Sequence, residues 1–123
     1  MIHVTDIAYT GYPVTDIARA RGFYEGLLNL KPTATWESEG KHWIEYDIGA
    51  TTLAISNMWA NWRPAADGPV AGLEVADFDA AMAALRDRCV KITVGPVDSG
   101  ACHLAVVSDP DGNSLAIHHR HVR

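Results

Sequence analysis

Four side chains of this 123-residue chain have the chemistry to move a proton in acid–base catalysis. They are two histidines and two glutamates: His118, His103, Glu74 and Glu45. An imidazole titrates near neutral pH, and a carboxylate placed beside an acid can act as its base. These four residues are therefore the candidate catalytic groups. Each also has a plain structural explanation, because strand-end histidines and solvated strand carboxylates are common in proteins.

A run of histidines near the end of the chain, residues 118–121, is similar in composition to metal-binding tracts. Neighbouring residues of a strand point to opposite faces of the sheet, so the run does not form one site. The sequence therefore predicts a frayed tail here rather than a metal centre.

The elements that must position these side chains follow from hydrophobic periodicity. Helical spacing begins directly after two residues suited to cap a helix, Asp16 and Asp77. Proline, glycine and alternating hydrophobic residues mark the strands. Strands are expected near residues 7–14, 33–38, 42–48, 51–57, 70–75, 91–94, 101–107 and 114–118.

The order of elements repeats once along the chain. Val14-Thr15-Asp16 matches Val75-Ala76-Asp77 at a separation of 61 residues, and Leu53-Ala54-Ile55 matches Leu115-Ala116-Ile117 at 62. Such self-similarity indicates a duplicated unit of strand, helix and three strands. We therefore expect an α+β fold in one domain, residues 1–123, built from two βαβββ modules. The modules span about 4–57 and 69–120, and residues 58–68 link them.

Composition limits the classes of partner. The formal net charge is −5, which argues against a nucleic-acid surface or an anionic membrane surface. No apolar run approaches the roughly 18 residues that a membrane span needs. Cys89 and Cys102 are too few for a disulfide framework, and no signal peptide is evident, so we expect a cytoplasmic protein.

Two motifs carry a resemblance to a known family. Residues 16–24, DIARARGFY, are followed by Leu27-Leu28-Asn29-Leu30, and residues 109–113 read DPDGN, a turn that feeds the last strand. Together they resemble the signatures of the vicinal oxygen chelate superfamily, which includes glyoxalase I, extradiol dioxygenases and bleomycin-resistance proteins. The resemblance implies two βαβββ modules whose sheets form an open cup, a homodimer, and a small-molecule ligand or substrate.

The resemblance also assigns four positions to metal ligands in those members that use a metal. In this sequence the four positions hold Tyr9, Ala54, Val70 and Ala116. Alanine and valine side chains carry no lone pair, and a divalent metal needs three or more N or O donors. We therefore expect no metal cofactor at these positions.

Strand alternation predicts which residues line the cup. The large aliphatic residues should face the helices: Leu53, Ile55, Leu73, Val75, Leu115 and Ile117. The opposite faces should bind the ligand, through Tyr9, Trp43, Ala54, Val70, Ala116 and His118. By the repeat register, Glu45 from one half and His103, Ala105 and Val107 from the other also face the cup. Trp59 and Trp62 either wall the cup or seal a dimer contact.

Two classes of function fit these residues. The first is a glyoxalase/bleomycin-resistance-like protein that lacks the usual metal ligands and binds a small apolar or aromatic molecule in the cup. The alternative is a lyase, isomerase or dioxygenase of the same superfamily, using either metal-free acid–base chemistry or a non-standard metal site. Metal content and a pH–rate profile distinguish them, and the sequence leaves open whether the protein is an enzyme.

Overall fold

The computed structural model describes residues 1–121, so the last two residues of the predicted domain, 122 and 123, lie outside it. The chain divides into two compact units, the first ending at Pro64 and the second beginning at Ala65. No helix in the described residues is long and apolar enough to cross a membrane.

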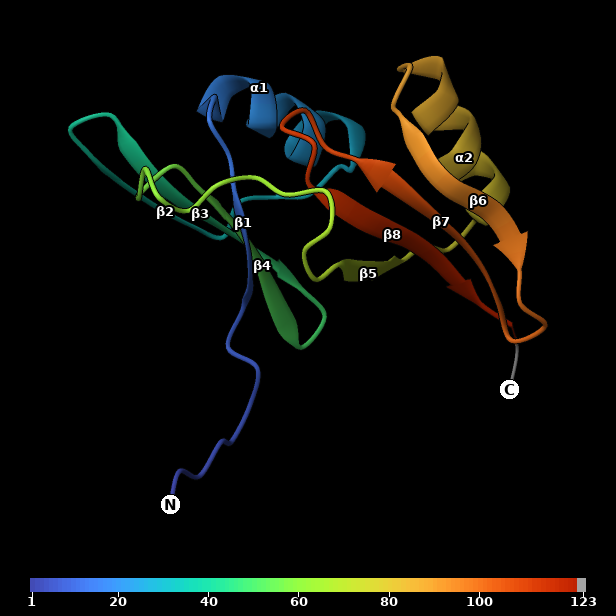
Figure 1. Ribbon diagram of the computed structural model, residues 1–123, viewed down its shortest axis with the longest axis horizontal. Coiled ribbons are helices and arrows are strands. Elements are labelled where there is room, and N and C mark those ends of the chain that lie inside the picture. Colours follow the sequence, from blue (N-terminus) through green and yellow to red (C-terminus); the bar gives the residue numbers. More distant parts are fainter. Residues whose placement is uncertain (122–123) are drawn as a thin grey trace. The chain divides into compact units, whose positions relative to one another are not determined.

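The first unit contains one four-stranded sheet and one interrupted helix (Figure 1). Its elements are β1 (Thr10–Pro13), α1 (Ile17–Arg21), η1 (Gly22–Leu27), β2 (Ala34–Ser38), β3 (Lys41–Ile48) and β4 (Thr51–Ser56). The strand order is β1-β4-β3-β2, with β1 parallel to β4 and the other neighbours antiparallel.

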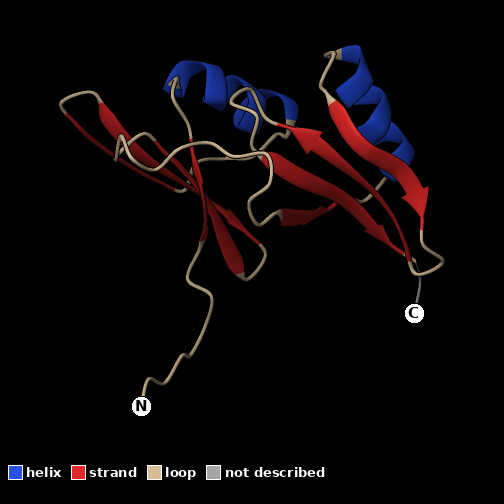
Figure 2. Cartoon of the chain, in the orientation of Figure 1, coloured by secondary structure: helices blue, strands red, loops and turns tan. Residues whose placement is uncertain are grey.

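The second unit repeats this arrangement. Its elements are β5 (Ala71–Glu74), α2 (Phe78–Asp87), β6 (Ile92–Asp98), β7 (Cys102–Ser108) and β8 (Ser114–Arg120). The order is β5-β8-β7-β6, and β5 is again parallel to its neighbour, β8 (Figure 2). The predicted α+β class and the βαβββ order are therefore confirmed, while the module boundaries stay a prediction.

Both predicted helix caps are present. The side chain of Asp16 accepts a hydrogen bond from the backbone N–H of Arg19, and Asp77 accepts one from Ala80, each at 3.0 Å. This pattern satisfies a backbone donor that the first helical turn leaves unpaired. The two halves of the chain therefore enter their helices in the same way.

The first helix does not continue as the single α-helix that its spacing suggests. It widens after Arg21 into the π-helical segment η1, in which the N–H of Leu28 bonds to the carbonyl of Phe23 at 3.0 Å. The neighbouring side chains Phe23 and Tyr24 are both buried. The wider turn allows two adjacent aromatic rings to enter the core, and Asn29 then ends the segment with a left-handed φ of 57°.

The core of each unit lies between its helix and its sheet. In the first unit the fully enclosed side chains include Tyr24, Ile44, Tyr46 and Ile55, and in the second Leu85, Val107, Leu115 and Ile117. Leu53, Ile55, Leu115 and Ile117 are buried as predicted. Leu73 and Val75 are only half-buried, because β5 is an edge strand with a neighbour on one side.

The predicted facing of β7 is wrong. Ala105 pairs with Ile117 and Val107 with Leu115, so these residues belong to the buried helix-side face. Ile44 pairs with Ile55 in the first unit. Ile55 and Ile117 take the same place in the two sheets and are 62 residues apart, whereas their ladder partners, Ile44 and Ala105, are 61 residues apart. The turns that connect these strands differ in length in the two units. A one-residue change in strand register moves every side chain of the strand to the opposite face of the sheet.

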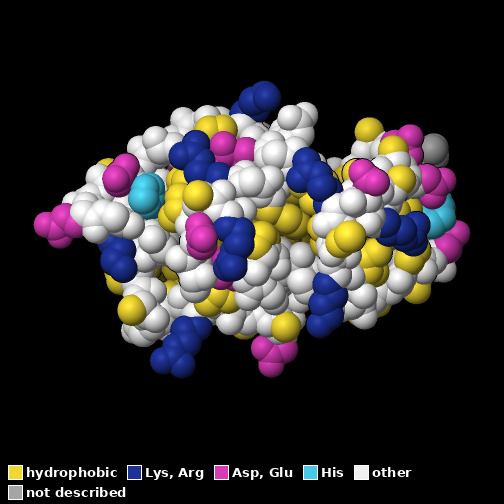
Figure 3. Space-filling view, turned by 90° about the horizontal axis from the view of Figure 1, so that it is seen from above, with side chains coloured by type: hydrophobic (Ala, Val, Ile, Leu, Met, Phe, Trp, Pro, Cys, Tyr) yellow, Lys and Arg dark blue, Asp and Glu magenta, His cyan; other side chains and the backbone are white. Residues whose placement is uncertain are grey.

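The end of the described chain is more ordered than the sequence suggests. β8 runs on to Arg120, and the N–H of His121 donates to the carbonyl of Ala101 at 3.0 Å. The expected frayed tail is therefore wrong for residues 118–121. The face of the molecule seen in Figure 3 mixes basic and acidic side chains, in keeping with the modest net charge of −5.

Candidate functional site

Four aromatic side chains of the first unit pack on the sheet face opposite the buried pair Ile44 and Ile55. This aromatic cluster consists of Tyr9, Trp43, Trp59 and Trp62. The ring of Trp43 is central: its centroid lies 5.1 Å from that of Tyr9 in an edge-on contact. It lies 6.3 Å from Trp59 and 6.4 Å from Trp62, nearly parallel to the latter. Such rings offer a flat, polarisable surface.

The local chain geometry explains how two indoles reach this face. The N–H of Trp62 donates to the carbonyl of Trp59 at 3.2 Å, which closes a turn and places their ring centroids 6.1 Å apart. Gly11 of β1 lies beneath: a Cβ at that position would be 3.0 Å from the Trp62 ring. The absence of a side chain at Gly11 therefore lets the indole approach the sheet.

Glu45 and Ala54 lie next to each other on this face. Ala54 pairs with Gly11 on one side and Glu45 on the other, and it is fully buried. The carboxylate of Glu45 accepts a hydrogen bond from the indole N–H of Trp43 at 2.8 Å. The structure thus gives Glu45 a role in orienting Trp43, while its predicted catalytic role stays a prediction.

A hollow of about 230 Å³ adjoins the cluster within the first unit. Trp59 and Trp62 line it together with two cationic side chains, Lys41 and Arg63. The remaining lining residues are Val14, Thr15, Asn57, Ala60 and Pro64. Aromatic walls with two positive charges suit a flat ligand that carries a negative group.

In the second unit Glu74 and His118 form a hydrogen-bonded pair. Nδ1 of His118 lies 2.5 Å from Oε1 of Glu74, and the partly exposed side chains come from the neighbouring strands β5 and β8. Oε2 of Glu74 accepts from the backbone N–H of Arg120 at 2.7 Å. A carboxylate that holds one imidazole nitrogen leaves the other free for proton transfer. The pair therefore has the geometry of an acid–base group.

We expect Glu74 to stabilise the fold in a pH-dependent way. The Arg120 N–H, followed by the His118 imidazole, lowers the pKa of the Glu74 carboxyl below its ordinary 4.5. Glu74 therefore contributes its full stabilisation of the fold at pH values above 4.5, and this stabilisation is lost as the pH falls through the lowered pKa. The melting temperature of the wild type should exceed that of Glu74→Gln near pH 6, and the gap should narrow near pH 3. A gap that is constant or widens in acid contradicts this explanation.

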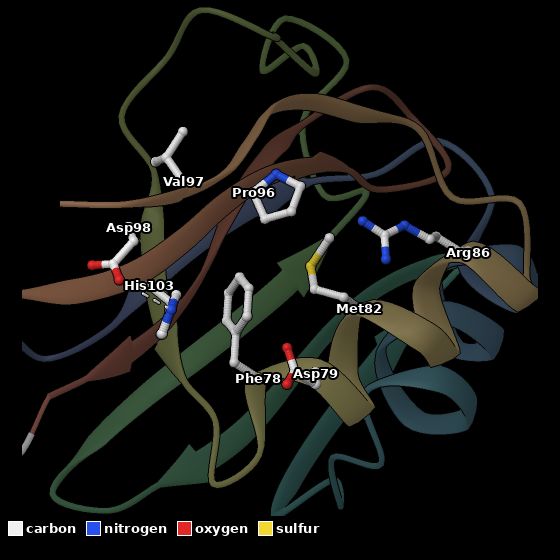
Figure 4. Close-up of a pocket in the computed structure, with 8 residues that line it drawn as sticks. All are labelled: Phe78, Asp79, Met82, Arg86, Pro96, Val97, Asp98 and His103. Carbon is white, nitrogen blue, oxygen red and sulfur yellow. Dashed lines mark ion pairs between the residues drawn. The ribbon is translucent and has the colours of Figure 1, made fainter. Parts of the chain in front are cut away.

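His103 lies on the helix-side face of its sheet, so its predicted place in the cup is wrong. Its ring stacks on that of Phe78 in α2 with centroids 5.4 Å apart, and it pairs across the ladder with His119. A pocket of about 520 Å³ opens there, between α2 and strands β6 and β7. Figure 4 shows Asp98 and His103 at one side of this pocket and Arg86 at the other.

The other predicted ligand-binding residues divide between the units. Tyr9, Trp43 and Ala54 are in the first, whereas Val70, Ala116 and His118 are in the second. Ala116 lies in β8 between Gly72 and Val106 in the ladder. Val70 is 48% exposed just before β5. The structure brings Tyr9 and Trp43 into contact, and the binding roles of all six residues stay predictions.

The sequence did not single out Lys41, Arg63 or Asp98 as functional residues. It indicated His121 only as part of the histidine-rich run 118–121, where no metal centre was expected. Lys41 and Arg63 flank the aromatic residues of the first unit, so the Trp-rich segment with its adjacent Arg was the available signal. Asp98 and His121 come together with His103 only through the pairing of β6, β7 and β8, which short-range spacing does not reveal.

Comparison with known proteins places this geometry in context. No curated protein matches the sequence. Among solved structures, the antibiotic binding protein TnmS3 from Streptomyces sp. CB03234 is similar, with 22% identity and a TM-score of 0.79. That match covers 98% of this chain and 100% of TnmS3. A glyoxalase/bleomycin resistance protein from the same organism is 25% identical over 91% of this chain and 98% of its own, with a TM-score of 0.73.

The duplicated βαβββ arrangement and these neighbours define a class of paired-module α+β proteins. The sequence matches the Glyoxalase/Bleomycin resistance protein/Dioxygenase superfamily over residues 6–117. The chain belongs to this superfamily. The family suggested by residues 16–24 and 109–113 is thus confirmed.

Proposed function

We propose that this protein binds a small, flat aromatic molecule bearing a negative group, on the aromatic cluster of its first unit. The observation that carries the proposal is the packing of Tyr9, Trp43, Trp59 and Trp62 beside a hollow lined by Lys41 and Arg63. A ligand ring that stacks on an indole gains about 0.5–1.5 kcal/mol beyond the burial of its area. The fold is compatible with this role, since TnmS3 is an antibiotic binding protein.

The proposal includes the loss of the superfamily's metal ligands. The positions that the resemblance assigns to them hold Tyr9, Ala54, Val70 and Ala116, of which only the tyrosine carries a donor. These residues do not fit a divalent metal. Binding on the cluster therefore requires no metal ion. We also expect a homodimer, because C₂ pairing is the commonest way to cover exposed sheet edges.

The test is a fluorescence titration with 8-anilinonaphthalene-1-sulfonate, a flat aromatic anion. Trp59→Ala and Trp62→Ala should each weaken binding about tenfold, which corresponds to about 1.4 kcal/mol. Val94→Ala is the control, because Val94 is an exposed apolar side chain on β6 of the second unit. Circular dichroism must show that each variant is folded.

A comparison of two probes tests the need for a negative charge on the ligand. Arg63→Gln should weaken binding of the sulfonate probe more than binding of the uncharged N-phenyl-1-naphthylamine, because only the sulfonate has a negative group that can pair with the arginine. The binding proposal is wrong if the two tryptophan variants bind the sulfonate as tightly as the wild type. It is also wrong if Val94→Ala weakens binding as much as they do.

Acid–base catalysis at the Glu74–His118 pair is the second candidate function. The observation in its favour is the 2.5 Å contact between His118 Nδ1 and Glu74 Oε1. A substrate turned over by this pair should show a rate that depends on the ionisation of one imidazole, and His118→Gln should abolish that dependence. If the protein only binds its ligand, His118→Gln removes no turnover.

A further inference from the structure

Three potential metal ligands meet at the end of the β6–β7 hairpin in the second unit. They are Asp98 of β6, His103 of β7 and His121, which directly follows β8. Nε2 of His121 lies 3.1 Å from Oδ1 of Asp98, and Nε2 of His103 lies 3.4 Å from Oδ2. One ligand atom from each residue lies within 4.8 Å of the other two. We call this group the hairpin triad.

Backbone pairing fixes where the triad residues lie. Asp98 and His103 are direct partners in the ladder between β6 and β7. The N–H of His121 donates to the carbonyl of Ala101 in the hairpin turn at 3.0 Å, and the N–H of Gly100 donates to Oδ1 of Asp98 at 2.8 Å. Because three strand ends hold the ligands in place, a metal would find them largely preorganised.

The spacing suits a small divalent metal. Zn²⁺ binds histidine nitrogen at about 2.0–2.1 Å, so the ligands of a tetrahedral site are about 3.4 Å apart. The two imidazole nitrogens lie 3.1 and 3.4 Å from different oxygens of the Asp98 carboxylate, close to this value, and one ligand atom from each residue lies within 4.8 Å of the others. The two imidazole rings lie edge to face with centroids 4.8 Å apart.

The ligand types also suit a cation, because Asp98 supplies a carboxylate oxygen and each histidine supplies a ring nitrogen. Two imidazoles and one carboxylate form a common ligand set for Zn²⁺ and for other first-row metals. The Phe78 ring supports one face of His103 and limits its orientation.

We propose that Asp98, His103 and His121 bind one divalent transition-metal ion. The residues differ from the four positions that the superfamily resemblance assigns to metal, and the site is independent of the aromatic cluster of the first unit. Three protein ligands leave a fourth position open to water or to a ligand atom. Asp98 and His103 also line the pocket of about 520 Å³ with Arg86, so an anionic small molecule in that pocket could supply the fourth ligand.

The experiment is a titration of untagged, chelator-treated protein with Zn²⁺ alone by isothermal calorimetry, and with Co²⁺ by visible absorption. We expect one ion per chain and the absorption bands of Co²⁺ bound by nitrogen and oxygen. We expect Zn²⁺ binding to weaken by at least about tenfold in each of His103→Gln, His121→Gln and Asp98→Asn. Substituting even a residue that only hydrogen-bonds to a metal ligand lowers metal affinity about 10–100-fold. His42→Gln is the control, because it removes a carboxylate-paired imidazole from the first unit.

A second measurement avoids substitution altogether. In nitrogen NMR spectra of histidine side chains, saturating Zn²⁺ should shift the Nε2 resonances of His103 and His121 and leave that of His42 unchanged. The proposal is overturned if Zn²⁺ does not bind, or if it binds with these two resonances unmoved. It is equally overturned if His42→Gln weakens binding as much as the triad variants do.

Discussion

Replacing Asp109 with alanine should destabilise the protein by about 3–5 kcal/mol, the largest loss that we expect from a single side-chain truncation here. Asp109 is 4% exposed and begins the turn before β8. Its Oδ1 accepts hydrogen bonds from the N–H groups of Asp111 and Asn113, both at 2.9 Å. Its Oδ2 accepts from the side-chain amide of Asn113, also at 2.9 Å.

The loss is large because the Asp109 carboxylate accepts three hydrogen bonds in a largely buried turn. Asn113 is 2% exposed, and its side-chain oxygen accepts from the N–H of Ala65 at 3.1 Å, so the carboxylate organises a buried network. Removing a charged acceptor leaves buried donors unpaired, which costs more than the bond contributes when it is present. Urea unfolding followed by circular dichroism measures the change in unfolding free energy.

Asp109→Asn is the matched control for this prediction. It keeps the shape and one acceptor oxygen, but its amide group faces the amide of Asn113 as donor to donor. We therefore expect a loss between those of the wild type and Asp109→Ala. If Asp109→Ala costs less than about 1 kcal/mol, the network contributes little and the turn is held by its backbone alone.

This turn illustrates what the sequence could and could not reveal. Pro110 and Gly112 identify a turn, and the N–H of Gly112 does donate to the carbonyl of Asp109 at 3.0 Å. Gly112 has a φ of 88°, which glycine adopts without strain. The buried network around Asp109 was not predictable, because it depends on residues 48 positions apart, Ala65 and Asn113, meeting in three dimensions.

In the candidate site, too, the sequence predicted some side-chain positions correctly and others wrongly. Alternation along β3 and β4 correctly placed Trp43, Glu45 and Ala54 on one face, because their two-residue turn leaves the register regular. The same reasoning failed on β7, where a longer turn shifts the pairing by one residue and moves His103 to the helix side. Periodicity therefore predicts faces within a strand pair and not across loops of unequal length.

Ala54→Trp should destabilise the protein by about 3 kcal/mol or more, at or above the upper end of what overpacking usually costs. Ala54 is fully buried and lies between Gly11 and Glu45 in the sheet. The Trp62 ring already occupies the space over Gly11, since a Cβ built on Gly11 would lie only 3.0 Å from a carbon of that ring. A second indole must therefore displace Trp62 or open the sheet.

Ala116→Trp is the matched control, because Ala116 takes the equivalent place in the repeat. It is half-buried rather than enclosed, and its neighbour Gly72 has no atom within 4 Å of where a Cβ would lie. We expect a loss of about 1 kcal/mol or less at this position. Urea unfolding of both variants measures the difference.

The comparison bears directly on the proposed binding site. If Ala54→Trp is strongly destabilising and Ala116→Trp is not, the sheet face of the first unit is already filled by its own tryptophans. A ligand then stacks on the outer surface of the aromatic cluster rather than on the sheet. Equal and small losses contradict the close packing of Trp62 over Gly11 and indicate that a ligand has room to reach Ala54 itself.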